Sequence, residues 1–157
     1  MLNCIWVILM IIQEIINELS EDLCITGTKK MNGILYIYCQ VNEVTAKCKY
    51  CGQESNKIHS RYLRTISDLP IQNYQVKLVI TVPKYFCCND ECPHKTFAYS
   101  FDFIEKNSIR TKRLNDYIYQ VALKNSSLDA KKQISSSHVQ VSNNTVLRIL
   151  KKKKRSQ

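Results

Sequence analysis

The first twenty residues carry apolar side chains at the spacing of a helix face. Gln13, Glu14 and other polar residues fall on the opposite side. This pattern predicts an amphipathic helix that packs on another part of the protein. Because Trp6, Val7 and Met10 make its first half apolar all round, that half is a candidate contact for a partner chain, a homodimer included. The positions that follow the helical spacing are Ile5, Ile8, Leu9, Ile12, Ile15, Ile16 and Leu19.

The apolar run Cys4–Ile12 within this segment is too short to cross a bilayer. It has nine residues, whereas a spanning helix needs about 20. No Lys or Arg precedes it, and no small-residue cleavage site follows it. We therefore expect neither an export signal nor a membrane anchor, no membrane partner, and cysteine thiols that are reduced.

Three stretches further along the chain have the β-branched and alternating character of strands. They are Gly33–Val41, Lys57–Thr65 and Tyr74–Val82, the last with Val76, Leu78, Ile80 and Val82 on one face. Cys39 in the first stretch is interpreted as a small core residue. Ser67–Pro70 has the chemistry of a turn, so the second and third stretches are predicted to form a hairpin.

From Asn107 onward the apolar period changes from two to 3.6. A first helix is marked by Leu114, Tyr117, Ile118 and Val121, and further helices are predicted over Leu128–Ile134 and Ser142–Leu150. Ser142 is a suitable N-cap for the last one, and Lys151–Arg155 is interpreted as a frayed helix end or disordered tail. The expected fold is α+β, with an N-terminal helix and lead-in (1–32), a small antiparallel zinc-ribbon-like sheet (33–104) and a helical segment with a basic tail (105–157).

The length of 157 residues excludes a large multi-domain enzyme, and the charge is unevenly distributed. The formal net charge is +10. Residues 1–104 carry 10 basic and 10 acidic side chains, whereas residues 105–157 carry 13 basic and 3 acidic ones. A segregated basic segment is typical of proteins that bind polyanions, because each contact with a phosphate releases counterions. The alternative is a lysine-rich composition on a solvated surface.

Eight cysteines in a reducing compartment favour a metal site over a disulfide scaffold. Cys48 and Cys51 form a Cys-x-x-Cys knuckle with Gly52 behind it, where a left-handed residue is often needed. Cys87 and Cys92 are the best second pair, and the predicted hairpin would bring them beside the first. The expected cofactor is one structural Zn²⁺ per chain, because four thiolates leave no position open for water activation. Cys88, which is also acceptably spaced from Cys92, and His94 and His59 remain alternative ligands, and unligated core thiols or disulfides remain the alternative to a metal.

The two last predicted helices have the size and order of a helix-turn-helix unit, whose second helix enters the major groove of DNA. If Val146, Ile149 and Leu150 face the core, then Asn144, Thr145 and Arg148 point outward, and these residue types suit contacts to base edges. The connecting turn is rich in Ser and lacks Gly. An ordinary three-helix bundle is the alternative. The candidate DNA-binding residues are Ser142, Asn143, Asn144, Thr145, Arg148, Lys151 and Lys152.

The order of these motifs resembles the N-terminal zinc-finger region of the ISL-three family of insertion-sequence transposases. The resemblance runs from about Ser20 to Leu150 and rests on Cys48-x-x-Cys51-Gly52, His59-Ser60-Arg61-Tyr62-x-Arg64-Thr65, Ser67-Asp68-Leu69-Pro70, Tyr85-Phe86-Cys87, and Cys92-Pro93-x-Lys95-Thr96-Phe97. The segment Ser142-x-x-Thr145-Val146-Leu147-Arg148 looks like the end of the helix-turn-helix that follows in the family.

The resemblance implies recognition of double-stranded DNA at the terminal inverted repeats of a transposable element, in a bacterial cytoplasm near the nucleoid. Family members then carry out DNA transposition and recombination with a downstream Asp-Asp-Glu domain, and this chain stops where that domain would begin. We therefore expect a truncated recognition part, with no catalytic residues, no enzyme activity and no small-molecule substrate. Asp68, Asp90, Glu91 and Asp102 are interpreted as turn and knuckle residues. A stand-alone zinc and helix-turn-helix transcriptional regulator and a dimerisation module are the alternative functions.

Overall fold

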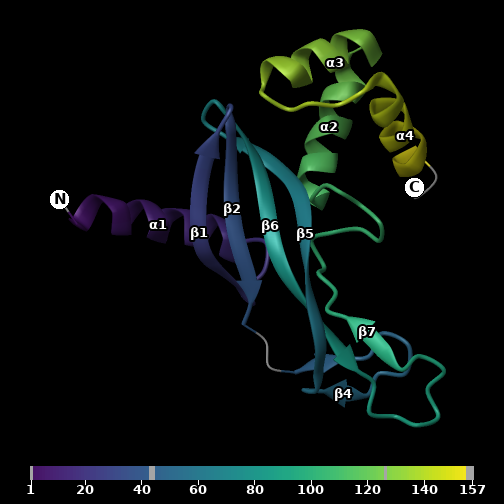
Figure 1. The fold of residues 1–157 in the computed structure, drawn as a ribbon. Coiled ribbons are helices and arrows are strands. Elements are labelled where there is room, and N and C mark those ends of the chain that lie inside the picture. Colours follow the sequence, from purple (N-terminus) through teal and green to yellow (C-terminus); the bar gives the residue numbers. More distant parts are fainter. Residues whose placement is uncertain (1, 43–44, 126, 155–157) are drawn as a thin grey trace. The chain divides into compact units, whose positions relative to one another are not determined.

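A computed structural model describes residues 2–42, 45–125 and 127–154 and shows an α+β fold, as predicted (Figure 1). The elements in chain order are α1 (Leu2–Asn17), β1 (Leu23–Met31), β2 (Ile34–Val41), β3 (Ala46–Lys47), β4 (Glu54–Ser55), β5 (Ile58–Ile71), β6 (Tyr74–Phe86), β7 (Thr96–Ala98), α2 (Lys112–Lys124), α3 (Ser127–Ser136) and α4 (Asn143–Lys154).

The strands form two sheets, where the sequence predicted a single small one. In the larger sheet the order is β1-β2-β6-β5, with β7 paired to β6, and the smaller sheet is the antiparallel pair β3-β4 (Figure 1). A two-residue turn joins β1 to β2, and both of its residues, Asn32 and Gly33, have positive φ (51° and 72°), which suits the twist of a hairpin. Strand β1 was not predicted from the sequence, because Gly27 and the two lysines of this strand, Lys29 and Lys30, weaken the strand signal.

The predicted strand segments are confirmed, but the turn predicted at Ser67–Pro70 is wrong. Strand β5 continues through this segment to Ile71, and the reversal into β6 lies at Gln72 and Asn73, with Gln72 at φ 52°. The buried Asp68 holds the segment in the strand through hydrogen bonds from Thr111 and Arg113. Pro70 is tolerated because β5 lies at the edge of the sheet, where a ladder N–H is not required. The face of β6 that carries Val76, Leu78, Ile80 and Val82 is buried, as predicted.

Helix α1 confirms the N-terminal amphipathic helix. Its Gln13 side chain is held by β1: Nε2 donates to the Leu23 carbonyl at 2.8 Å, and Oε1 accepts from the Ile25 N–H at 2.9 Å. Ile16 is buried, whereas Met10 is exposed. None of the helices in the described part of the chain has both the length and the apolar character needed to cross a bilayer. The side chains predicted at Ile5, Trp6, Val7, Ile8 and Leu9 lie outside the described residues.

The chain divides into two compact units. One comprises Met1–Thr28, Ile37–Thr65 and Leu78–Asp102, and we call it the cysteine unit because it contains both cysteine knuckles. The other comprises Lys29–Tyr36, Ile66–Lys77 and Phe103–Gln157, and we call it the helical unit. Each unit is considered by itself below.

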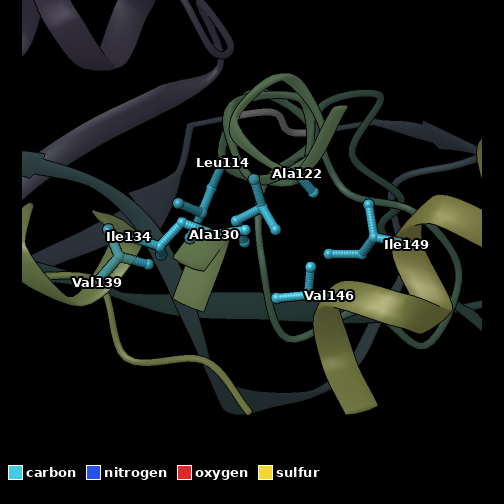
Figure 2. Close-up of a cluster of buried hydrophobic side chains, with 8 residues drawn as sticks. Leu114, Ala122, Ala130, Ile134, Val139, Val146 and Ile149 are labelled. Carbon is cyan, nitrogen blue, oxygen red and sulfur yellow. The ribbon is translucent and has the colours of Figure 1, made fainter. Parts of the chain in front are cut away.

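In the helical unit, α2, α3 and α4 each pack on the other two, which confirms the three predicted helices. Their shared core is closed by side chains from all three helices and from the segment before α4 (Figure 2). Figure 2 shows Leu114 and Ala122 of α2 opposite residues of α3 and α4. The buried members are Leu114, Ile118, Ala122, Ala130, Ile134, Val139, Val146 and Ile149.

The turn between α3 and α4 ends α3 without a glycine. His138 takes the left-handed conformation (φ 61°), its N–H donates to the Ser135 carbonyl at 3.1 Å, and the Val139 N–H donates to the Ile134 carbonyl at 3.2 Å. These are the two bonds of a Schellman motif, and the buried Ile134 and Val139 supply its hydrophobic contact. The serine-rich turn therefore stops α3 at a defined residue.

Helix α4 begins and ends with side-chain support. The Ser142 Oγ accepts from the Thr145 N–H at 3.2 Å, which confirms the predicted N-cap. The helix runs to Lys154, so the interpretation of Lys151–Lys154 as a frayed end or disordered tail is wrong; Arg155 lies outside the described residues. Four lysines in the last turn interact favourably with the negative end of the helix dipole.

Candidate functional site: a metal centre and a basic helix

The first cysteine knuckle is the turn between β3 and β4. The Cys48 N–H donates to the Gln53 carbonyl at 2.8 Å, and the Gly52 N–H donates back to the Cys48 carbonyl at 2.7 Å. Gly52 has φ 78°, which confirms the left-handed position expected after Cys51. The turn therefore holds the two cysteines on one tight loop.

The second knuckle is the loop between β6 and β7. The Cys87 N–H donates to the Lys95 carbonyl at 2.9 Å, which extends the pairing of β6 with β7 by one bond. Inside the loop, the Cys92 N–H donates to the Asn89 carbonyl at 3.1 Å. This inner turn brings Cys92 back toward Cys87 across the four residues between them.

The two knuckles bring four sulfurs together in one cluster. The Sγ atoms of Cys48, Cys51, Cys87 and Cys92 all lie within 4.8 Å of one another, and those of Cys51 and Cys87 are 3.5 Å apart. Four sulfurs at 2.3 Å from a tetrahedral zinc ion are about 3.8 Å apart. The donor number, donor type and spacing fit one structural Zn²⁺, which crosslinks the two knuckles when bound and has no open coordination position.

A small apolar cluster packs against the metal centre. It consists of the buried Cys48, Tyr85, Cys92 and Phe97, with Ala46, Cys87 and Tyr99 packed at its edge. The rings of Tyr85 and Phe97 stack with centroids 5.7 Å apart. So few side chains cannot hold a module together by burial alone, which is why the metal matters for its fold.

The alternative ligands lie outside the cluster. The Cys88 Sγ is 3.4 Å from the Ser55 Oγ, to which it donates. The ring of His94 stacks on Tyr50 with centroids 3.4 Å apart, and His59 lies on β5. Cys39 is a buried core residue as predicted, and burial raises the pKa of its thiol to about 12.

Cys51, Cys87 and Cys92 of the cluster do not ionise alike. A backbone hydrogen bond at Gln53 lowers the pKa of Cys51 to about 7. A backbone hydrogen bond at Asn89 lowers the pKa of Cys87, but burial and the neighbouring Cys51 raise it to about 12. The pKa of Cys92 is also raised, because burial and Cys51 outweigh the backbone bond at His94. Before metal binds, Cys51 therefore ionises more readily than Cys87 and Cys92, which hold protons at neutral pH.

Zinc binding should consequently depend steeply on pH. Because the pKa values of Cys87 and Cys92 are raised, each thiol must lose a proton to the solvent when zinc binds, so affinity increases with pH and falls on acidification. We expect at least two protons released per zinc ion between pH 6 and 8. Competition with a zinc-binding dye across this range measures it, and an affinity that does not change with pH would contradict the assignment.

Helix α4 presents the candidate DNA-binding residues with different exposures. Asn144 and Arg148 are exposed, as predicted, whereas Thr145 is half-buried, and its Oγ1 lies 3.1 Å from the Ser142 Oγ. The Asn143 Oδ1 is buried and has no hydrogen-bond partner in the described part of the chain. Lys151 and Lys152 are exposed. The side chains of α4 that point away from the core are therefore mainly basic or amide-bearing.

Two lysines of α4 are already engaged with carboxylates. The Lys152 Nζ lies 2.5 Å from the Glu105 Oε2, and the Lys153 Nζ lies 2.6 Å from the Asp116 Oδ1. The hydrogen bond to Asp116 raises the pKa of Lys153. Both pairs are largely exposed, so each contributes little to stability. No such pair is present for Lys151 or Arg148 among the described residues.

Sequence reasoning missed a buried ion pair in the helical unit. The Asp68 carboxylate on β5 accepts two hydrogen bonds from the Arg113 guanidinium, one from Nε at 2.9 Å and one from Nη2. It also accepts from the Thr111 Oγ1 at 2.7 Å. Thr111 is at the same time the N-cap of α2 and accepts from the Leu114 N–H at 3.2 Å. Asp68 therefore fixes the start of α2 and is no turn residue. The N-cap threonine before an apolar helical pattern was the signal that could have pointed to this end of the pair.

Residues 45–92 match the model of the zinc-finger family of the transposases IS204/IS1001/IS1096/IS1165. The matched segment contains all four clustered cysteines. The chain matches no curated protein and no solved structure. The match confirms the resemblance to the ISL-three transposases for the zinc finger, and together with the sulfur cluster it supports one structural zinc ion.

Proposed function

We propose that this chain, whose residues 45–92 form a transposase zinc finger, recognises double-stranded DNA at the terminal inverted repeats of a transposable element. The match to a transposase zinc finger supports a role in transposition, and the exposed basic residues of α4 would contact the DNA. The observation that carries the proposal is the joint presence of these two features in one chain. The chain serves recognition, in the cytoplasm and near bacterial DNA, and takes no part in catalysis.

The helical unit acts as a helix-turn-helix in this proposal. Two observations support this role: the core-facing residues Val146 and Ile149 of α4 are buried, and Asn144 and Arg148 are exposed, as entry of a recognition helix into the major groove requires. Asn144 can pair with an adenine, and Arg148 can pair with a guanine through two hydrogen bonds. Lys151 then lies one turn further along, where it meets the phosphate backbone.

The direct test is a gel-shift titration with the full chain, loaded with zinc, against duplexes from the ends of the parent element. We expect tighter binding to these ends than to random duplex of the same length at moderate salt. Equal affinity for both would contradict sequence-specific recognition, and binding restricted to a promoter would favour a transcriptional regulator.

A dimerisation module is the second candidate, favoured by the exposed apolar Met10 and Ile11 on α1 (63% and 50% exposed). Sedimentation with and without DNA distinguishes the two functions. A dimer that forms without DNA and shows no affinity for duplex would support the second candidate and oppose the first.

Replacing Arg148 should relax sequence preference. The variant Arg148→Gln removes the forked donor, and a good bidentate contact with guanine contributes about 1–3 kcal/mol of discrimination against the wrong base. We expect a clearly larger loss of affinity for the element ends than for random duplex. Lys124→Gln, an exposed residue at the end of α2 with the same loss of charge, is the matched control. An equal loss on both duplexes would assign Arg148 to the backbone instead.

A further inference from the structure

The helical unit contains a hollow of about 240 Å³ between α4 and the loop that precedes α2. Among the residues that the structure describes, its charged lining consists of Lys106, Arg110, Arg148 and Lys152, with Glu105 as the single acid. Glu105 is already paired with Lys152. Four positive charges and one negative charge therefore face one open hollow, and this imbalance attracts an anion.

Hydrogen bonds hold both the side chain and the backbone of Arg110 in this hollow. It is half-buried, and its Nε donates to the Asn115 Oδ1 at 3.1 Å, which fixes the plane of the guanidinium. The Ser108 Oγ accepts from the Arg110 N–H at 3.1 Å and donates to the Arg110 carbonyl at 2.8 Å, so the backbone is held as well. An arginine fixed by an amide at Nε keeps its two terminal nitrogens available for an oxyanion.

The charged group that acts on Arg110 is another cation, Arg148. Burial, and after it the charge of Arg148, lower the pKa of Arg110, although an arginine stays charged at neutral pH. Neither arginine forms an ion pair with an acid within the described ranges of the chain. Two neighbouring guanidinium groups repel each other, and a bound anion would remove this repulsion. The arrangement therefore disfavours the empty state and favours an oxyanion.

We propose that this hollow binds one phosphate of the DNA backbone, next to the base pair that Arg148 contacts. The proposal rests on the proposed function and adds Arg110 and Lys106 to the interface, residues outside the predicted recognition helix. A phosphodiester fits because it offers two non-bridging oxygens, which share one negative charge, to the fork of Arg110. A phosphate bound here fixes the register of α4 in the groove, since backbone contacts position a reader while base contacts specify the sequence.

The experiment measures how DNA affinity depends on salt for two variants with opposite charge changes. Arg110→Gln should reduce the slope of log affinity against log salt by about 0.9, the value for one phosphate contact, with the same loss on element ends and on random duplex. Glu105→Gln removes the one acid and should strengthen binding to both duplexes. Lys124→Gln, outside the hollow, is the control for loss of a single charge.

Each outcome has a defined meaning. If the unmodified chain binds duplex and Arg110→Gln leaves the slope unchanged, the phosphate site is wrong and the proposed function stands. If the unmodified chain binds no duplex, both fail. In a separate measurement, inorganic phosphate is titrated against the chain while the Arg110 Nε–H signal is followed by nuclear magnetic resonance. Saturation without any effect of Arg110→Gln on DNA binding would assign the hollow to a free phosphate and overturn the DNA assignment.

Thermal melting separates this role from a structural one. Arg110→Gln removes the repulsion from Arg148 but also the hydrogen bond to Asn115, and because these two effects oppose each other the melting temperature should change little. A weaker DNA complex with unchanged melting supports the phosphate site. A large fall in melting temperature together with an unchanged salt slope would show that Arg110 serves the fold alone.

Discussion

Replacing Cys87 with serine should abolish zinc binding and unfold the zinc finger. Cys87 contributes one of four sulfurs within 4.8 Å of one another, and three thiolates with a poor hydroxyl donor hold zinc far more weakly. Structural zinc contributes about 10–16 kcal/mol of apparent binding free energy in small zinc modules, and this energy is also folding energy. Metal analysis after purification under reducing conditions should fall from one zinc per chain to nearly none.

Cys88→Ser is the matched control, because it makes the same change in the adjacent residue of the same loop. Its Sγ contacts the Ser55 Oγ, and a serine hydroxyl can keep that hydrogen bond. We expect one zinc per chain and an unchanged cobalt-thiolate absorption spectrum. The reverse result, with zinc lost from Cys88→Ser and kept by Cys87→Ser, would show that the second knuckle uses the other cysteine.

The sequence favoured Cys87 and left Cys88 open as an alternative ligand, and the course of β6 explains why Cys87 lies in the cluster. Its even-numbered residues from Val76 to Val82 are buried, and extending this alternation would turn position 88 inward. However, Val82 and Pro83 are buried in succession, which shifts the alternation by one residue and places Tyr85 on the buried side. Cys87 then follows Tyr85 on that side, since alternate residues share a face.

The parts of the fold that were predicted correctly depend on local pattern. The apolar periods located α1, α2, α3 and α4, and the cysteine spacing identified the metal ligands. The error at Ser67–Pro70 has a different origin. Asp68 stays in a strand because of Thr111 and Arg113, which are more than forty residues away in the chain. Local turn chemistry contains no information about such a partner.

Asp68→Ala should destabilise the helical unit by about 3 kcal/mol, the lower end of the range for breaking a buried ion pair by removing one partner. The Asp68 side chain is 2% exposed, and its loss leaves Arg113 without its carboxylate and removes the acceptor of the Thr111 hydroxyl. The cost is placed at the lower end because Arg113 is 26% exposed and can turn partly toward water. Chemical denaturation measures the change.

Asp102→Ala is the control for loss of an acidic side chain, because Asp102 is exposed, and it should change stability by less than about 0.5 kcal/mol. Zinc content should stay at one per chain in both variants, since the four sulfurs belong to the cysteine unit and Asp68 to the helical unit. DNA affinity should fall in Asp68→Ala alone, because Thr111, the N-cap of α2, directly follows Arg110 in the chain. If Asp68→Ala were as stable as the unmodified chain, the Asp68–Arg113 pair would be dispensable, and the start of α2 would depend on the Thr111 cap and the helical core.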